Sequence, residues 1–339
     1  PSSPSIAPLP AIAEASVPPG HGTLRTFHHL QREVISAGLC TRCGGCVSFC
    51  SAGALNALEM GGGPSGSDLP RYADRKNCLA CGICYMICPA TGDLDQELQE
   101  TFGWRAPIGH YRAVRSARAL DETIHARGTD GGVVTALLLY MLEKRQIDGA
   151  IVSQPPDEQP PFRRPAERPL FRRPVIATTR QALIDAAGSH LGTSAHLEEL
   201  GSQFTTYSPT LSAVKALGQA AGQAGETPAA LQRVAMVGTP CQIRTVKKMQ
   251  CLGVLPAHVI LYTIGLFCMQ SFDFDAAGQR RLEERMQARV GRPVHLYQIE
   301  KLNVKEDLIV SLRDGATVRL PFDELVEMAH PGCLACTDF

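Results

Sequence analysis

Residues 40–50 read CTRCGGCVSFC, and residues 78–88 repeat the pattern as CLACGICYMIC. Each run has the spacing C-x2-C-x2-C-x3-C, so most of the 13 cysteines lie in two short segments. Glycines between the cysteines, such as Gly44 and Gly82, let the backbone wrap closely around the sulfur atoms. The segment from 39 to 93 is too short and too rich in loop residues to form an ordinary apolar core, so bound groups must hold it together.

This spacing is that of bacterial two-cluster ferredoxins, in which the fourth cysteine of each run ligates the cluster of the other run. Structural zinc is the alternative, because CxxC pairs also bind zinc. A third cysteine two residues further on and a crossed fourth ligand favour iron–sulfur clusters. The predicted ligands are Cys40, Cys43, Cys46 and Cys88 for one [4Fe-4S] cluster, and Cys78, Cys81, Cys84 and Cys50 for the second.

Composition and charge exclude some classes of protein. The chain has 339 residues with 33 Lys+Arg and 33 Asp+Glu, so it has no general basic field, and we expect no nucleic-acid partner. Its longest nearly apolar run, VVTALLLYML at 133–142, is about half the length of a membrane-spanning helix, so no transmembrane segment is expected. Clustered cysteines in a long chain are not typical of a disulfide-bonded secreted domain, and we predict a reducing, cytoplasmic location.

The pattern of residues changes along the chain. After Gly128, helix and strand signals alternate, which predicts an α/β fold with a mixed sheet. The expected organisation is a flexible Pro- and Ala-rich tail at 1–22, a two-cluster ferredoxin domain at 23–100, a connector at 101–127 and the larger α/β domain at 128–339. The expected strands are 147–153, 175–178, 233–238, 259–267, 295–303 and 307–314, and the expected helices are 23–38, 128–146 after a glycine-rich turn, 180–187, 210–224, 242–250 and 273–289.

A second set of cysteines lies far from the first two runs. Cys241 follows one predicted strand at the start of a helix, Cys268 ends the next strand, and Cys333 and Cys336 form a CxxC pair. If the two strands are parallel neighbours, both cysteines lie at carboxyl ends, where open α/β sheets bind ligands. Four thiolates meeting there could bind another [4Fe-4S] cluster. The alternative is a group of buried or redox-active thiols with an incidental CxxC pair, and spacing alone does not choose between them.

Other features allow two interpretations each. The run ARGTDGGVVTAL at 126–137 is either a tight turn or a phosphate site, because a glycine turn that opens a helix offers backbone N–H groups and a positive dipole end to a dinucleotide. The five arginines at 163–173 are either a solvated surface or a clamp for an acidic ligand. Cys251 has no partner in the sequence pattern and is expected to be a packed core cysteine.

Five segments together carry a resemblance to a known family: TDGGVVTALL, GSQFTTYSPTLSAVKAL, VGTPCQIRTVKKM, GLFC and CLACTDF. They resemble the beta subunit of the coenzyme F-420-reducing hydrogenase and its relatives, which are the F-420H2 dehydrogenase input subunit, F-420-dependent sulfite reductase and 7-hydroxymethyl chlorophyll a reductase. The resemblance covers about 128–339. The two-cluster ferredoxin region before it looks like the arrangement in the dehydrogenase and the sulfite reductase.

The resemblance implies FAD in the α/β domain and a third [4Fe-4S] cluster beside it. Gln203 stands where many relatives carry a lysine, which removes a positive charge near the flavin, and the chain stops at Phe339 where relatives continue. The residues implied near the flavin are Gly128, Thr129, Asp130, Gly131, Gly132, Thr135, Gln203, Ser208, Pro209, Thr210, Gly238, Thr239 and Pro240, and those implied at the third cluster are Cys241, Cys268, Cys333 and Cys336.

The function implied is that of an iron–sulfur flavoprotein oxidoreductase. Reduced coenzyme F-420 would give a hydride to FAD, and three clusters would pass single electrons to a redox partner, such as a hydrogenase or a heterodisulfide-reductase-like complex, or in the reverse direction. One alternative is a ferredoxin-dependent FAD reductase of an organic substrate such as a chlorophyll-type tetrapyrrole. Another is a non-catalytic electron-relay subunit of a larger complex.

Overall fold

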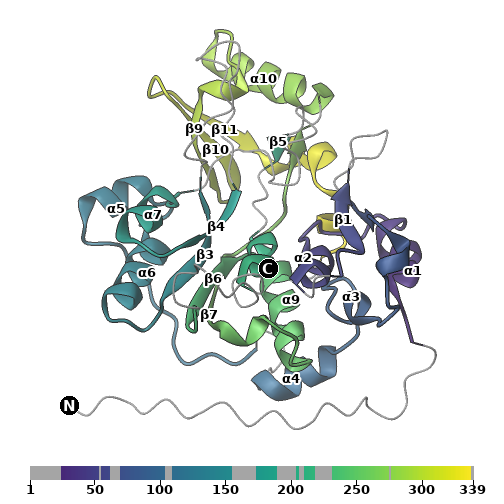
Figure 1. Cartoon of the computed structure of the whole chain (residues 1–339). Helices are drawn as coiled ribbons and strands as arrows, with labels where there is room; N and C mark the ends of the chain where they lie inside the picture. The colour runs from purple at the N-terminus through teal and green to yellow at the C-terminus, as the bar shows by residue number, and fades with distance from the viewer. Residues whose placement is uncertain are drawn as a thin grey trace.

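The computed structural model describes residues 24–52, 55–61, 69–103, 109–154, 173–188, 204–205, 210–217, 231–274 and 276–336. Figure 1 shows that they form a cysteine-rich unit on the right, an α/β unit with a central sheet on the left, and a smaller unit at the top. The predicted tail at 1–22 and three predicted flavin residues, Gln203, Ser208 and Pro209, lie outside the described residues. None of the helices in the described part is long and apolar enough to cross a membrane.

The cysteine-rich unit has an apolar cluster packed among its two cysteine runs. Phe27, Leu30, Val34 and Tyr85 are buried there with several of the cysteines. The helix expected at 23–38 is present in a shorter form, and an antiparallel hairpin joins the two runs. The elements are α1 (Phe27–Leu30), the π-helix η1 (Gln31–Ile35), α2 (Gly45–Ala52), β1 (Leu58–Gly61), β2 (Leu69–Tyr72), the 3-10 helix η2 (Arg75–Asn77), α3 (Ile83–Met86) and α4 (Asp95–Phe102).

The central sheet has the strand order β4-β3-β6-β7. Strands β3, β6 and β7 are parallel and β4 is antiparallel to β3, so the prediction of a mixed sheet is confirmed. Strand β6 is buried at every position, as expected of a parallel strand that is covered on both faces. The bounds, which lie close to the expected segments, are β3 (Gly149–Gln154), β4 (Arg173–Ala177), β6 (Val234–Gly238) and β7 (Ile260–Gly265).

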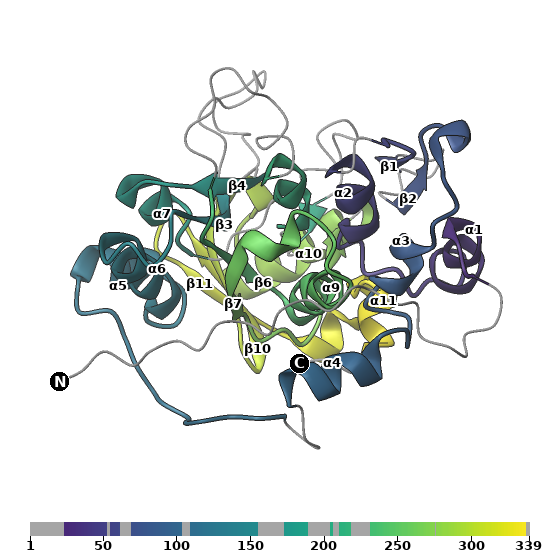
Figure 2. The same cartoon turned by 60° about the horizontal axis from the view of Figure 1, so that its bottom comes forward.

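Helices cover both faces of this sheet (Figure 2). On one face, Leu138 of α6 is buried in a cluster with Ala150 of β3 and Ala235 of β6. On the other face, Val246 of α9 is buried in a cluster with Met236 of β6. Helix α9 lies between the sheet and the cysteine-rich unit and therefore joins them. The helices are α5 (Glu122–Arg127), α6 (Val133–Glu143), α7 (Arg180–Asp185) and α9 (Pro240–Cys251).

The smaller unit packs one helix on an antiparallel sheet of order β11-β10-β9. Leu282 and Met286 of the helix share a buried core with Leu308 and Val310 of β10. The sequence pattern did not predict β11, and the strand expected at 295–303 begins with a 3-10 turn and becomes extended only from Ile299. The elements are α10 (Ala276–Val290), β9 (Ile299–Val304), β10 (Asp307–Leu312) and β11 (Thr317–Pro321), together with a short ladder of β5 (Phe204–Thr205) and β8 (Asp273–Phe274).

The cysteine-rich unit is docked firmly on the α/β unit. The Ser48 hydroxyl on α2 donates a hydrogen bond to the carbonyl of Leu211 (2.7 Å) and accepts one from the amide of Lys215 (3.1 Å). Gly45 is so close to α9 that a Cβ atom there would lie 2.4 Å from Cγ2 of Thr245. Polar pairing and close packing at this interface fix how the two cysteine runs face α9.

Candidate functional site

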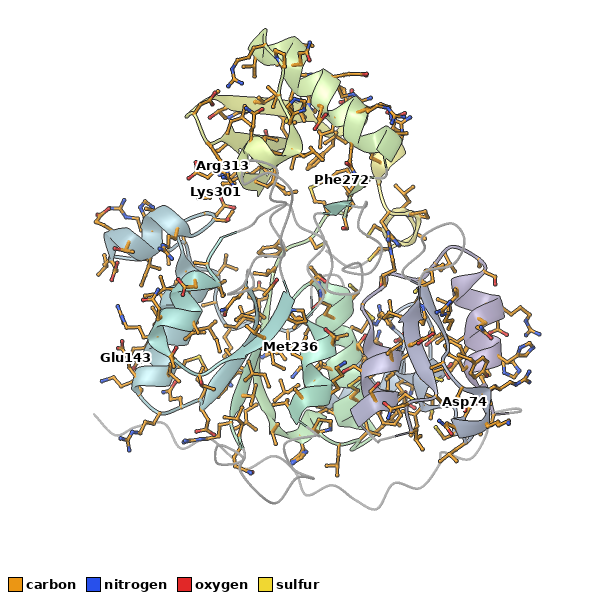
Figure 3. All side chains as sticks on the ribbon, turned by 45° about the horizontal axis from the view of Figure 1, so that its top comes forward. Asp74, Glu143, Met236, Phe272, Lys301 and Arg313 are labelled. Carbon is orange, nitrogen blue, oxygen red and sulfur yellow. The ribbon has the colours of Figure 1, made fainter. Side chains whose placement is uncertain are left out.

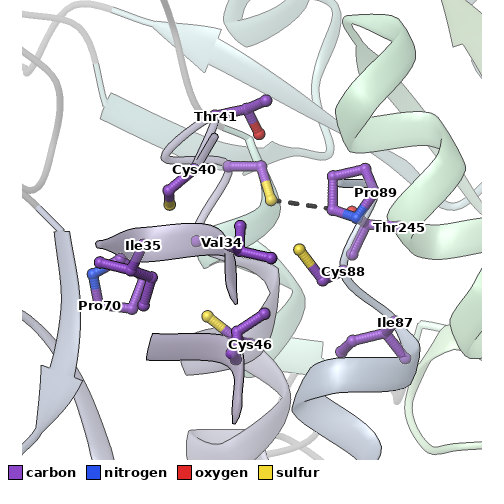
Figure 4. Close-up of a pocket in the computed structure, with 13 residues that line it drawn as sticks. Val34, Ile35, Cys40, Thr41, Cys46, Pro70, Ile87, Cys88, Pro89 and Thr245 are labelled. Atoms are coloured by element: carbon purple, nitrogen blue, oxygen red, sulfur yellow. Dashed lines mark hydrogen bonds between the residues drawn. The ribbon is translucent and has the colours of Figure 1, made fainter. Parts of the chain in front are cut away.

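The structure divides the first eight cysteines into two groups. Figure 4 shows Cys40, Cys46 and Cys88 turned toward one cavity, which Cys43 also lines. We call this the inner cysteine cavity, because α9 borders it through Thr245. A second cavity, the outer cysteine cavity, is lined by Cys50, Cys78, Cys81 and Cys84.

The grouping matches the crossed arrangement that the spacing predicted. The fourth cysteine of each run, Cys50 or Cys88, lies with the first three cysteines of the other run. Within the described residues, no three His, Cys, Asp or Glu side chains are placed to chelate a single metal ion. The binding of clusters in the two cavities stays a prediction.

The two runs have the same local backbone. In each run the second and fourth residues after the first cysteine have a left-handed conformation, with φ of 57° at Arg42, 75° at Gly44, 52° at Ala80 and 76° at Gly82. A Cβ atom on Gly82 would lie 2.7 Å from the carbonyl oxygen of Arg25, so this position requires glycine. Two such turns in a row curl each run around its cavity.

Burial dominates the electrostatics of both cavities. It raises the pKa of the Cys84 thiol and of the Cys88 thiol to about 12, and it also raises the pKa of Cys43 and Cys46. Neighbouring cysteines raise the pKa of Cys46 further. Thiolates in such buried surroundings need a bound cationic centre to stabilise their charge, and metal coordination deprotonates thiols outright. The cavities therefore fit metal–sulfur groups and not isolated thiolates.

The second cysteine set gathers at the carboxyl edge of the sheet. Strands β6 and β7 are parallel neighbours, which was the condition set by the sequence pattern, and Gly238 is paired with Gly265 at their ends. Burial, with smaller contributions from the neighbouring Cys333 and Cys336, raises the pKa of Cys268 to about 11. These three cysteines therefore lie near one another.

Cys241 reaches this group from the start of α9. It lines a cavity together with Cys336, Asp95 and Arg244. The hydroxyl oxygen of Thr239, which precedes α9, lies 3.2 Å from the sulfur of Cys241. Cys268 and Cys333 are not part of the lining of this cavity. Cys336 is thus near Cys268 and Cys333 and also lines a cavity with Cys241, but this cavity is not lined by all four predicted cysteines.

The CxxC pair begins on a short helix, α11 (Pro331–Leu334), which lies against the first cysteine run; Cys333 is on the helix and Cys336 follows its end. A Cβ atom on Gly332 would lie 2.8 Å from the carbonyl oxygen of Cys40. His330 caps the helix, because its Nδ1 accepts a hydrogen bond from the Gly332 amide at 3.1 Å. Burial, together with the charge of Arg42, lowers the pKa of His330 to about 3, so its ring is neutral. Nothing in the sequence pattern marked His330.

The glycine-rich turn has the strained backbone expected of a ligand-binding or tight turn. Asp130, Gly131 and Gly132 have φ of 51°, 95° and 70°, and Gly132 is the N-cap of α6. A Cβ atom on Gly128 would lie 2.3 Å from Cα of Gly132. Thr135, one turn into the helix, is buried. Because α6 leads directly into β3 and packs on it, the turn lies at the carboxyl edge of the parallel strands.

Two lysines that the sequence pattern did not single out secure this turn from the smaller unit. Lys301 of β9, labelled in Figure 3, donates a hydrogen bond to the carbonyl of Gly128. Lys305 pairs with the carboxylate of Asp130 at 2.9 Å. Both lie in a region of alternating polar and apolar residues, where a lysine looks like any solvated side chain, so no local signal could have marked them.

Thr210 and the Gly238–Thr239–Pro240 turn meet at the end of β6. The hydroxyl of Thr210 donates to the carbonyl of Val237 at 2.9 Å, and its amide donates to Oε1 of Gln242 at 2.9 Å. Gln242 is fully buried. The structure therefore brings Thr210, one of the predicted flavin residues, into contact with the GTPCQ segment at residues 238–242.

Comparison with known proteins agrees with this architecture. The family model for the N-terminal part of the coenzyme F420 hydrogenase/dehydrogenase beta subunit matches residues 114–200, and the model for its C terminus matches residues 231–339. The chain belongs to this family. The resemblance described from the sequence motifs is thereby confirmed.

Several relatives show how far the similarity extends. The chain is 26% identical over 323 residues to the coenzyme F420-dependent sulfite reductase of Methanocaldococcus jannaschii, an alignment that spans 91% of this chain but 41% of the relative. It is 23% identical over 313 residues to a subunit of the F(420)H(2) dehydrogenase of Methanosarcina mazei, with 91% and 74% covered. With the beta subunit of the coenzyme F420 hydrogenase of Methanosarcina barkeri it shares 27% identity over 236 residues, 68% of each chain.

The coverage separates two kinds of family member. The family models begin only at residue 114, and the part of the chain from there onward is shorter than 91% of it. The two alignments that span 91% of the chain must therefore include part of the cysteine-rich unit. A solved chain of the F420-reducing [NiFe] hydrogenase complex from Methanosarcina barkeri matches with a TM-score of 0.51 and 26% identity, covering 70% of this chain and 69% of that one.

Proposed function

We propose that the chain is an iron–sulfur flavoprotein oxidoreductase that transfers electrons between reduced coenzyme F420 and a partner redox protein. The observation that carries this proposal is the order of its three cysteine groups, which lead from the carboxyl edge of the sheet to the surface. Its family supports the coenzyme, since each relative described above bears F420 in its name.

The residues present fit the groups that this function needs. The inner and outer cavities each offer four cysteines for a [4Fe-4S] cluster, and the second cysteine set offers four more. For FAD, the glycine-rich turn offers backbone N–H groups at the start of the 11-residue helix α6. When bound, FAD accepts a hydride and gives up single electrons, which iron–sulfur clusters carry one at a time.

The protein contributes positioning. Lys301 and Lys305 hold the glycine-rich turn, and Thr210 with Gln242 fixes the end of β6 at the same sheet edge. Gly332 brings the CxxC helix against Cys40 of the first run. From there the cysteine groups continue through the inner cavity to the outer one. Cys81 of the outer cavity is exposed, which suits electron exchange with a partner protein.

The deciding experiment is performed without oxygen on protein that retains its iron and flavin. Reduced coenzyme F420 is added, and the bleaching of flavin and cluster absorbance is followed, with NADH as the control. We expect rapid bleaching by reduced F420 only. No bleaching by F420, together with reduction of the bound flavin by a reduced ferredoxin, would overturn the F420 assignment in favour of a ferredoxin-dependent reductase. Protein that binds clusters but no flavin would instead be an electron-relay subunit.

A further inference from the structure

Helix α9 buries a lysine beside the inner cysteine cavity. Within the described residues, Lys248 is the only Lys, Arg, Asp or Glu side chain that is buried, and none of its surface is exposed. Its Nζ donates hydrogen bonds to the carbonyls of Cys88 (2.9 Å) and Thr91 (2.8 Å) and pairs with Oδ1 of Asp95 at 3.1 Å. An ammonium group has three N–H donors, and here three acceptors surround it. The site is therefore built for a positive charge.

Stability alone is a poor reason for this arrangement. Taking a charge out of water costs several kcal/mol, and replacing a buried ion pair by apolar side chains of similar volume is often neutral or stabilising. The other oxygen of Asp95 pairs with Arg244 at 2.7 Å, so the carboxylate also has a second cation beside it. The buried ammonium group of Lys248 is therefore expected to act on the neighbouring cysteines.

The same face of α9 carries the groups that border two cysteine sites. Cys241, Thr245 and Lys248 are spaced four and three residues apart, so they lie along one side of the helix. The hydroxyl of Thr245 donates to the carbonyl of Cys241 at 2.9 Å, and its oxygen lies 3.7 Å from the sulfur of Cys43. Helix α9 thus contributes Thr245 to the wall of the inner cavity, and one turn later Lys248 holds the backbone carbonyl of Cys88, which lines the same cavity.

The outer cavity has no equivalent. Its lining consists of its four cysteines with Phe27, Phe49, Leu55, Leu58 and other uncharged residues, and no buried cation lies among the described residues around it. The two cavities share a spacing and a backbone, and the buried charge distinguishes them.

We propose that Lys248 is a positioning residue whose fixed positive charge raises the reduction potential of a cluster in the inner cavity above that of a cluster in the outer cavity. This inference rests on the proposed function. Reduction adds one negative charge to a cluster, and a cation held in a low-dielectric site stabilises that charge. One electron then moves from the reduced outer cluster to the oxidised inner cluster, so the inner site is where electrons collect.

Redox titration of the intact protein, followed by electron paramagnetic resonance, tests this. In Lys248→Met we expect the equilibrium ratio of reduced outer cluster to reduced inner cluster to rise by at least about tenfold. For a one-electron couple this equals a change of about 59 mV in the difference between the two reduction potentials. In Asp95→Asn, which removes a negative charge from the same cluster of side chains, it should move the opposite way. The control is Lys247→Met, because Lys247 lies over the ring of Phe102 at 4.7 Å and its Nζ donates to Gln250, whereas Lys248 donates to the carbonyl of Cys88. A Cys81→Ser variant identifies the outer signal.

The outcomes separate the possible failures. Shifts of the same sign in Lys248→Met and Asp95→Asn would mean that the pair acts only through structure, which overturns the inference. Equal shifts in both clusters would overturn it as well. If Lys248→Met does not fold, the absence of a shift in Asp95→Asn still refutes the charge effect. If the unaltered protein shows no cluster signals, the proposed function itself fails.

Discussion

The inner and outer cysteine cavities start from the same spacing and the same pair of left-handed turns, yet their surroundings differ. The inner cavity is closed by α9, which contributes Thr245 to its wall, and Cys43 is buried. In the outer cavity Cys81 is exposed, and the adjacent Leu79 is 69% exposed. Local sequence therefore determines how each run curls around its cavity, whereas distant sequence determines whether that cavity is enclosed or open.

The largest expected effect comes from removing one cysteine from each cavity. Cys43→Ser should lose about four iron atoms and also weaken docking on α9, since Cys43 is packed in the same core cluster as Val246. Cys81→Ser should lose a similar amount of iron but leave thermal unfolding of the α/β unit nearly unchanged. Iron analysis and calorimetry of both variants measure the difference. Equal destabilisation by the two would show that the cavities are not distinct in their coupling to the α/β unit.

A smaller effect is expected at the contact that encloses the inner cavity. Gly45→Ala places a methyl group where it would lie 2.4 Å from Cγ2 of Thr245, and overpacking of this kind costs about 1–3 kcal/mol. The double variant Gly45→Ala with Thr245→Ser removes the opposing methyl group, keeps the hydroxyl and should recover most of the loss. Gly265→Ala is the control, because nothing lies within 4 Å of its Cβ position.

Thermal unfolding of the cluster-loaded protein measures these changes. A loss in Gly45→Ala that the Thr245→Ser change does not relieve would mean that the second close contact, with Cδ1 of Leu211 at 3.2 Å, and not the contact with α9, explains the requirement for glycine. The outer run offers a comparison at Gly82, where the close neighbour is a backbone carbonyl that no side-chain change can remove.

Much of this site could be predicted from the sequence, because its information is local. The crossed cysteine groups follow from the spacing, and the pairing of β6 with β7 follows from two apolar runs joined by one helix. The roles of Lys248 and Lys301 could not be predicted. Each acts on a backbone carbonyl more than 150 residues away, so its contacts depend on tertiary packing and leave no mark in the pattern around it.

The smallest effect concerns the acid sensitivity of the side of the unit that lies away from α9. There, Glu33 of η1 accepts a hydrogen bond from the hydroxyl of Tyr85 at 2.7 Å, and Tyr85 accepts one from Arg25. The hydrogen bonds from Tyr85 and Arg32 lower the pKa of Glu33 below its ordinary value of 4.5. A carboxyl group with a lowered pKa stabilises the fold fully above its unfolded pKa, and that contribution is lost as the pH falls through the folded pKa.

Acidification below pH 4.5 should therefore loosen η1, which lines the inner cavity through Val34 and Ile35, from α3, and Glu33→Gln should reduce this pH dependence. The matched control is Glu59→Gln, which breaks an exposed pair with Arg71 in the same unit. The measurement is the rate of iron release between about pH 5.5 and pH 3.5, which is about one unit on either side of the ordinary glutamate value. It is made on the protein and both variants, with the two cluster signals followed separately. If Glu33→Gln slows the acid loss of both clusters equally, the two cavities respond as one unit, and the contrast between an enclosed inner site and an open outer site does not extend to their stability.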